Sequence, residues 1–228
     1  MVLELVDKDT WIVEGPELPF LGLMVGTRMT IVRLGDELWI HSSVSISDEM
    51  AGEVERLGKL RYIIAPNKYH HVLLSEWRDR YPEAELYASP GLKAKRPDVA
   101  FDSELLATGT YSWSGAIAHT IFGPSRLFDE VVFFHRSSGT LILTDLIINA
   151  KTDGYNLFQR LFSAFDGLSY PNGGTPRLYR WSIKSKKSAK EVYQTMIDWA
   201  PSKVIISHGE WFRRDGLSEV KKRFSWVA

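Results

Sequence analysis

Cysteine is absent from the 228-residue sequence. Its absence excludes disulfide bonds, thiolate metal ligands and a cysteine nucleophile, so any bound metal must use nitrogen and oxygen donors. The 28 basic and 28 acidic residues cancel, which leaves no net charge to attract the chain to nucleic acid or to an anionic membrane. We therefore expect a small-molecule substrate and neither a nucleic-acid nor a membrane partner. The sequence does not predict an oligomeric state.

Long hydrophobic runs are also missing. No apolar stretch reaches the 18 residues of a membrane-spanning helix, and the stretch M-V-L-E-L-V-D-K-D carries acids where a signal peptide has basic residues. The expected compartment is therefore the cytoplasm. Apolar residues make up 44% and aromatic residues 12% of the chain, which is enough for a large core and argues against disorder. With no linker or internal repeat, we expect one domain over residues 1–228.

Strands are predicted where β-branched and apolar residues cluster between turn residues. Residues 27–41 indicate a hairpin, and residues 62–65 a short buried strand. The apolar runs 131–134 and 140–148 indicate a second hairpin, and residues 204–207 the last strand. Each of these segments is short, as expected for strands buried in a layered domain.

Helices are predicted between and after these strands. Capping residues and apolar spacing place them over 47–58, 71–80, 156–165, 188–199 and 217–224. The helix over 188–199 opens with a Ser-x-x-Glu pattern, which is typical of a capping box. Strands grouped early and in the middle, with helices between them, predict an α/β layered domain.

Residues able to hold a metal follow several of the predicted strands. Ligand sites in layered α/β folds commonly form where strand ends converge. Imidazole and carboxylate groups are the ligands that zinc, iron and manganese take in proteins. The candidates at these strand ends are Asn67, His70, His71, Asp145 and His208.

Each candidate also has a purely structural interpretation. Asp145 lies in a run that is apolar on both faces, where an ionised carboxylate loses several kcal/mol of hydration unless it is paired or bound to a cation. Hydrogen bonds within the fold would also compensate it. His208, before Gly209, is by itself more typical of a hydrogen-bonded structural histidine. His70 and His71 fit either a surface pair or two ligands in a first helical turn.

The order of these predicted strands and helices, with the candidate ligands between them, resembles that of the metallo-β-lactamase-fold superfamily over roughly residues 27–215. The resemblance implies an αβ/βα four-layer sandwich with two mixed β-sheets. The superfamily motif T-H-x-H-x-D-H overlays A-P-N-K-Y-H-H at 65–71, which places His70 on the motif aspartate and His71 on its last histidine. Pro66 and Lys68 then stand where the first two motif histidines belong.

The resemblance also assigns the later candidates. Asp145 matches the acid that bridges two metals in family members, and His208 matches the closing histidine before glycine. Since the first metal's histidines are missing, the resemblance implies one divalent ion, most simply zinc, with iron or manganese as alternatives. Its expected ligands are His70, His71, Asp145 and His208.

A single ion with an open coordination position implies a metal-dependent hydrolase of a small substrate. His70 replaces the aspartate that orients the attacking water in the family, so it is the candidate catalytic residue, as a ligand or as a neutral base. The alternative is a non-catalytic or metal-free protein that kept the fold for binding or scaffolding. Four protein ligands can also close a purely structural site.

Asn67, two further histidines and a group of basic residues also have alternative interpretations. A one-residue shift of the overlay brings Asn67 into the ligand set, and His119 lies in the region of the missing third histidine. His135 pairs near Thr140 in the predicted hairpin, about 16 Å from Asp145 at about 3.3 Å per residue, which indicates a structural role. Lys93, Lys95 and Arg96 are either substrate-binding cations at the mouth of the site or solvated loop residues.

Overall fold

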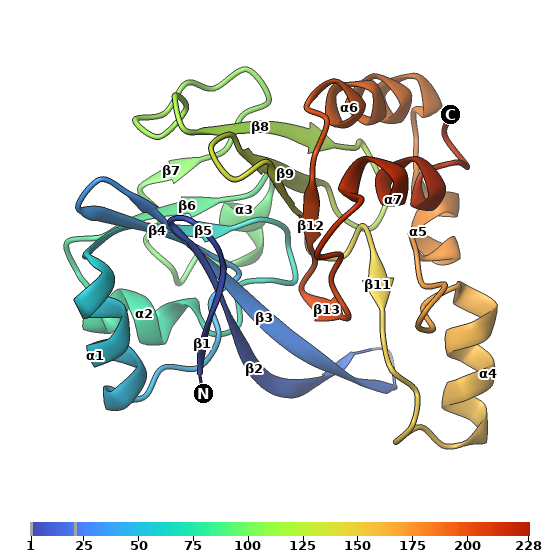
Figure 1. Cartoon of the computed structure of the whole chain (residues 1–228), viewed down its shortest axis with the longest axis horizontal. Helices are drawn as coiled ribbons and strands as arrows, with labels where there is room; N and C mark the ends of the chain where they lie inside the picture. The colour runs from blue at the N-terminus through green and yellow to red at the C-terminus, as the bar shows by residue number, and fades with distance from the viewer. Residues whose placement is uncertain (1, 21) are drawn as a thin grey trace.

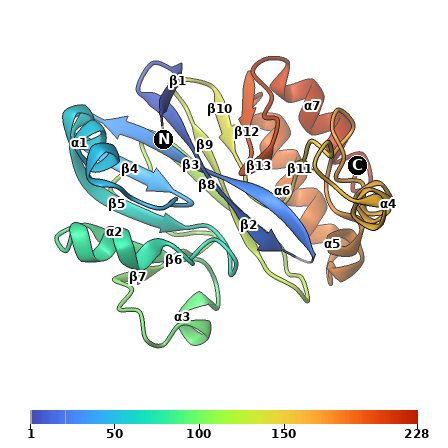
Figure 2. The same cartoon turned by 90° about the horizontal axis from the view of Figure 1, so that it is seen from below.

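Two β-sheets face each other at the centre of the molecule, and helices cover both outer sides (Figures 1 and 2). The computed structural model describes residues 2–20 and 22–228. Both sheets contain parallel and antiparallel pairs. This arrangement confirms the expected four-layer αβ/βα sandwich with two mixed sheets.

The first sheet has seven strands that lie side by side in chain order. They are β1 (Leu3–Asp7), β2 (Thr10–Phe20), β3 (Leu23–Leu34), β4 (Glu37–His41), β5 (Lys59–Ala65), β6 (Glu85–Ala88) and β7 (Ser103–Glu104). Strands β1 to β4 are antiparallel, and the pairs from β4 to β7 are parallel. The hairpin predicted over 27–41 is confirmed, with Leu34 opposite Glu37 beside the turn.

The second sheet has the strand order β12-β10-β9-β8. Its members are β8 (Ile117–Phe122), β9 (Glu130–His135), β10 (Thr140–Ile142) and β12 (Lys203–Ile205), and a separate parallel pair joins β11 (Ile148–Asn149) to β13 (His208–Gly209). The single strand predicted over 140–148 was wrong. The amide groups of Thr144 and Asp145 bond to the carboxylate of Glu130, so the chain leaves the sheet there.

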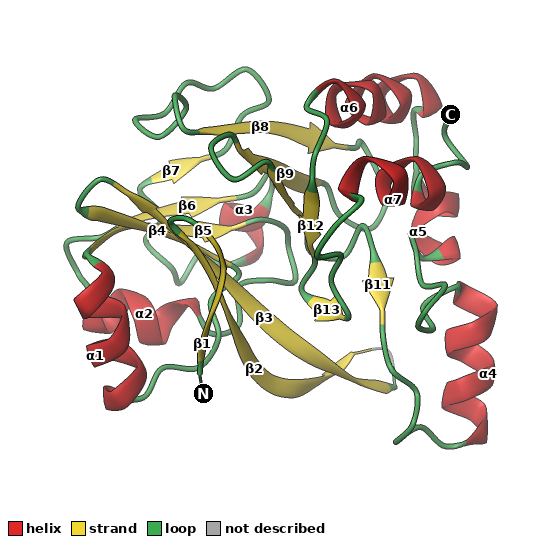
Figure 3. Ribbon diagram, in the orientation of Figure 1, coloured by secondary structure: helices red, strands yellow, loops and turns green. Residues whose placement is uncertain are grey.

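Helices flank the two sheets (Figure 3). On the side of the first sheet lie α1 (Asp48–Leu57), α2 (Leu74–Arg80) and α3 (Leu92–Lys95). On the side of the second sheet lie α4 (Leu157–Asp166), α5 (Arg177–Ser182), α6 (Lys186–Asp198) and α7 (Gly216–Arg223). The longest, α6, has 13 residues, and no helix in 2–20 or 22–228 is long and apolar enough to cross a bilayer.

Two helix starts differ from the sequence-based prediction. Helix α2 begins at Leu74, so His70 and His71 lie in the turn before it. Helix α6 begins at Lys186, because Ser185 is the residue whose side chain accepts a hydrogen bond from the amide of Ser188. The hydroxyl of Ser188 donates to the carbonyl of Gly123 instead, so the capping box assigned to Ser188 was wrong.

Apolar side chains fill the three spaces between layers. Ile31, Met50 and Trp77 belong to the cluster between the first sheet and its helices. Trp39 and Phe133 meet between the sheets, with ring centroids 5.0 Å apart. A third cluster joins the second sheet to α6 and α7. Since a fully buried large side chain stabilises the fold by about 1.5–3 kcal/mol, these layers hold the strand ends in fixed positions.

Candidate metal centre

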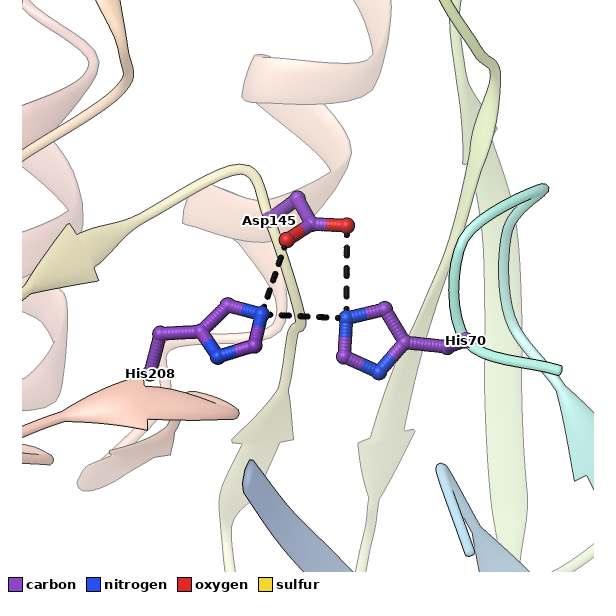
Figure 4. A group of neighbouring side chains, drawn as sticks. All are labelled: His70, Asp145 and His208. Carbon is purple, nitrogen blue, oxygen red and sulfur yellow. Dashed lines mark hydrogen bonds and ion pairs between the residues drawn. The ribbon is translucent and has the colours of Figure 1, made fainter. Parts of the chain in front are cut away.

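Three of the predicted ligands meet at one point between the sheets (Figure 4). The Nε2 atom of His208 lies 3.0 Å from Oδ1 of Asp145, and Nε2 of His70 lies 3.3 Å from Oδ2 of the same carboxylate. The two Nε2 atoms are 3.2 Å apart. The residues come from the turn after β5, the loop after β10 and the start of β13, so only the tertiary fold brings them together.

The outer nitrogen of each imidazole is engaged by the protein. Nδ1 of His208 lies 2.6 Å from the carbonyl oxygen of Gly26. A carbonyl only accepts hydrogen bonds, so Nδ1 carries the proton. Nδ1 of His70 lies 2.6 Å from Oγ of Ser42, which can accept its proton in the same way. In the neutral forms, both Nε2 lone pairs then face Asp145, as in metal-binding histidines whose second nitrogen is held by the protein.

This arrangement requires positive charge at its centre. A neutral His208 would place a lone pair 3.0 Å from a carboxylate oxygen, which is repulsive unless a proton or a cation lies between them. Burial lowers the pKa of His208, but the hydrogen bond and charge of Asp145 outweigh it and raise the pKa overall. Burial opposes ionisation of Asp145, yet the charge of His70 and the bonds from both imidazoles hold its pKa well below the ordinary range. The donor set therefore fits a divalent cation.

Asn67 supports the centre from behind. Its Oδ1 accepts hydrogen bonds from the amides of Tyr69 and His70, at 2.8 and 3.1 Å. Its Nδ2 donates to Oδ2 of Asp145 at 2.7 Å. Because the oxygen is used by the backbone, the amide presents only N–H groups to the centre, and these cannot bind a cation. The structure therefore places Asn67 as a positioning residue and not among the ligand atoms.

A buried acid that sequence reasoning missed completes this support. Glu130 accepts the amides of Thr144 and Asp145, both at 2.8 Å, and Nδ2 of Asn67 at 3.1 Å. Burial, followed by the negative charge of Asp145, raises the pKa of Glu130 to about 7. Glu130 begins the apolar strand E-V-V-F-F-H, and an acid beside an apolar run was the signal that singled out Asp145. The same signal could have identified Glu130.

His71 does not join the group. Its Nδ1 accepts a hydrogen bond from Nη1 of Arg96 at 2.9 Å, and burial, with the charges of Lys95 and Arg96, lowers its pKa to about 4. Neighbouring side chains in the turn before α2 point to different partners, so the expectation that both histidines face one ion needs correction. The structure brings together two imidazoles and one carboxylate, and not three imidazoles and one carboxylate.

His119 and His135 lie elsewhere. His119, on β8, uses Nε2 to bond the carbonyl of Leu106 at 2.9 Å. His135 pairs with Thr140 as expected, and its Nδ1 lies 3.0 Å from Oγ1 of Thr10 and 2.8 Å from Oγ of Ser138. Neither is part of the group formed by the predicted ligands.

A cavity of about 260 Å³ opens over the three side chains. Leu18 and Val25, from the β2–β3 hairpin, contribute apolar wall, and Ser43 contributes a hydroxyl. Lys95 also lines this cavity, with its Nζ donating to the carbonyl of Lys68 at 2.5 Å. The site thus has space for a small molecule beside the two imidazoles and the carboxylate.

Solved metallo-β-lactamases share this architecture. The DIM-1 enzyme exposed to ceftazidime aligns with a TM-score of 0.70 and 14% identity over 99% of this chain and 95% of that chain. The enzyme from Pontibacter korlensis aligns with a TM-score of 0.65 and 14% identity over 99% and 98%. The mono-zinc form of FIM-1 from Pseudomonas aeruginosa gives 0.66 and 14% over 99% and 94%. At this identity the comparison establishes the fold.

Sequence comparison identifies the family. No curated protein matches the chain. The family model described as "Domain of unknown function (DUF4336)" matches residues 9–170. That segment is well over half of the chain and contains His70 and Asp145, although His208 lies beyond it. The chain therefore belongs to the DUF4336 family and has the metallo-β-lactamase fold.

Proposed function

We propose that this protein is a metal-dependent hydrolase of a small substrate, with one divalent ion held by Nε2 of His70, Nε2 of His208 and the carboxylate of Asp145. The observation that carries the proposal is the convergence of these atoms, 3.0–3.3 Å apart, with Nδ1 of His208 committed to a backbone carbonyl. Zinc suits two imidazoles and a carboxylate, and iron and manganese are the alternatives.

Three protein ligands are the number that catalytic metal sites use, because one coordination position must stay open. All three residues line the 260 Å³ cavity, so the site is accessible to a substrate. When bound, the ion would supply Lewis acidity, which makes water a stronger acid and polarises a carbonyl or phosphoryl oxygen.

The protein's own groups hold this donor set in place. The Gly26 carbonyl and the Ser42 hydroxyl orient the two imidazoles. Asn67 fixes Oδ2 of Asp145. His70 acts as a ligand in this centre, because its Nε2 faces the carboxylate and its Nδ1 is held by the hydroxyl of Ser42. Lys95, at the cavity wall, is positioned to attract an anionic or polarised group of the substrate.

Metal analysis of tag-free protein tests the centre directly. We expect about one zinc, iron or manganese ion per chain after gentle purification, because a folded site with intact ligands retains its ion. His208→Ala should lower the occupancy sharply. Occupancy below about 0.1 per chain would instead favour a metal-free binding or scaffold protein.

Activity is tested separately with the metal-loaded protein. A panel of esters, lactones, phosphodiesters and amides should contain at least one class that the wild type hydrolyses and the His208→Ala variant does not. Full metal occupancy with no hydrolysis of any class would show that the ion has a structural role.

A further inference from the structure

A second cleft, of about 430 Å³, lies directly beside the proposed metal centre. Asp145, Val25 and Tyr69 line both this cleft and the smaller cavity over the histidines, so the two spaces adjoin. Its far wall comes from α4 and α5, which stand next to β11 (Figure 1). Pockets of this size are typical of sites for small organic ligands.

Apolar side chains form most of the wall of this cleft. Phe128, Ile148 and Leu178 contribute apolar side chains from three different segments. Phe162 of α4 and Leu168 add further apolar surface. A wall of this composition favours hydrocarbon, since removing apolar surface from water is favourable in proportion to its area.

Two polar side chains of the wall are used by the protein itself. Oδ1 of Asp166 accepts the amide of Leu178 at 2.8 Å, at the start of α5. The hydroxyl of Ser182 donates to the carbonyl of Tyr179 at 2.7 Å. These two groups hold α5 in place, and the exposed Arg126 is the cationic side chain of a wall that is otherwise mostly apolar. A sugar or a nucleotide would lose hydration against the apolar part of this wall without regaining it.

The cleft has a buried end and an exposed end. Asp145, Ile148 and Leu168 are buried, whereas Leu127 and Trp181 are exposed. The inner end thus lies at the proposed reaction centre, and the outer end opens to solvent between two large apolar residues. A molecule with a reactive head and a long tail fits this shape.

We propose that the cleft binds the hydrocarbon chain of the substrate and that the substrate is an acyl ester or lactone with a medium or long chain. This inference rests on the proposed hydrolase function, which would act on the acyl group at the inner end. Hydrolysis adds water across the acyl carbon–oxygen bond: the acyl carbon gains a hydroxyl group, the carbon–oxygen bond breaks, and the second proton goes to the departing alkoxide.

Binding is tested with neutral alkan-1-ols from butan-1-ol to nonan-1-ol, titrated into the purified full chain by calorimetry. These probes cannot be hydrolysed, so the measurement does not depend on activity. Affinity should rise by up to about fourfold for each added methylene group until the cleft is filled. Constant affinity along the series, or no binding of nonan-1-ol, would overturn the proposal.

Matched variants locate the binding. Leu178→Trp places bulk inside the cleft and should weaken nonan-1-ol binding at least tenfold. Leu161→Trp makes the same change at an exposed position of α4 outside the cleft and should leave binding unchanged. Leu127→Asp, at an exposed position of the rim, perturbs folding least and should also weaken binding. Equal affinities in all three variants would show that the alkanols bind elsewhere.

Ester hydrolysis separates the cleft from the proposed function. With the metal-loaded protein, kcat/KM for p-nitrophenyl octanoate should exceed that for the acetate at least tenfold, and Leu178→Trp should remove the difference. Equal cleavage of both esters without alkanol binding would refute the cleft and leave the hydrolase standing. Alkanol binding that responds to the variants, with neither ester cleaved, would support the cleft as a hydrocarbon site and count against the hydrolase.

Discussion

Nε2 of His208 lies 3.0 Å from Oδ1 of Asp145, while Nδ1 of the same ring donates to the carbonyl of Gly26. The backbone carbonyl therefore decides which nitrogen faces the carboxylate. Because Nδ1 keeps its proton for Gly26, Nε2 of His208 either carries a second proton toward Asp145 or binds a cation there. Protonation and metal binding compete for one lone pair.

Metal binding should therefore release a proton from His208. Because Asp145 raises the pKa of His208 above its ordinary value, the ring is protonated more fully near neutral pH than a free histidine. Zinc affinity should rise with pH below that raised pKa, by up to about tenfold per pH unit for one displaced proton. Calorimetry in buffers of different ionisation enthalpy measures the release.

Asp145→Asn provides the control for that measurement. It removes the charge that raises the pKa of His208, so both zinc affinity and proton release should fall. Asp166→Asn removes a buried carboxylate in the adjoining cleft and should change neither. A proton release that survives in Asp145→Asn would mean that another group is displaced.

Asn67→Asp should destabilise the fold. Nδ2 of Asn67 donates to Asp145 and Glu130. The substitution would replace this donor with a third carboxylate, which repels the two buried carboxylates. We expect the free energy of unfolding to fall by about 3 kcal/mol or more, the usual cost of an uncompensated buried charge. Urea denaturation with chelator present measures this. Asn172→Asp, at an exposed position, is the matched control, and similar losses in both variants would contradict the role of Asn67.

The two neighbouring histidines should behave differently. His70→Ala removes an atom of the proposed donor set and should weaken zinc binding at least about 100-fold, since even supporting residues of metal sites contribute 10–100-fold. His71→Ala removes a ring that bonds Arg96 and should leave zinc affinity nearly unchanged. Competition with a chromophoric chelator measures both. Equal losses would return His71 to the ligand set.

His41 should make the protein sensitive to acid. The ring is buried beside Trp39 and Phe133, and neither ring nitrogen has a hydrogen-bond partner among the described residues. Burial, followed by the charge of His70, lowers its pKa from 6.5 to about 3. The unfolded chain therefore binds a proton between those values while the folded chain does not, so this histidine lowers stability as the pH falls from 6.5 toward 3.

His41→Phe tests this effect. The variant should be more stable by about 1–3 kcal/mol, because it removes a buried group without partners. Its stability should also decline less with acid, by up to about 1.4 kcal/mol per pH unit. Urea denaturation between pH 4.5 and 7 measures both, and His119→Phe should retain the acid sensitivity that His41 causes. An unchanged pH dependence in His41→Phe would contradict the assignment.

Local patterns predicted much of the fold. Ser47 caps α1 as its position before two acids indicated, and the hairpin over 27–41 turns where expected. These features depend on neighbours in the chain, so the sequence shows them directly. No strand was predicted over β2, where Gly15, Pro16 and Pro19 are residues typical of turns; pairing with β3 makes the segment a strand.

The sequence by itself determined which residues are candidates for holding a metal, since an acid or a histidine beside a buried strand is visible in the chain. Tertiary structure decided which of them meet. The sequence does not distinguish the neighbouring residues His70 and His71. Only packing turns the ring of His70 toward Asp145 and the ring of His71 toward Arg96. Glu130 and Asn67 both bond Asp145, which lies 15 residues from Glu130 and 78 residues from Asn67 in the chain, so only the stacking of the sheets gives them their roles.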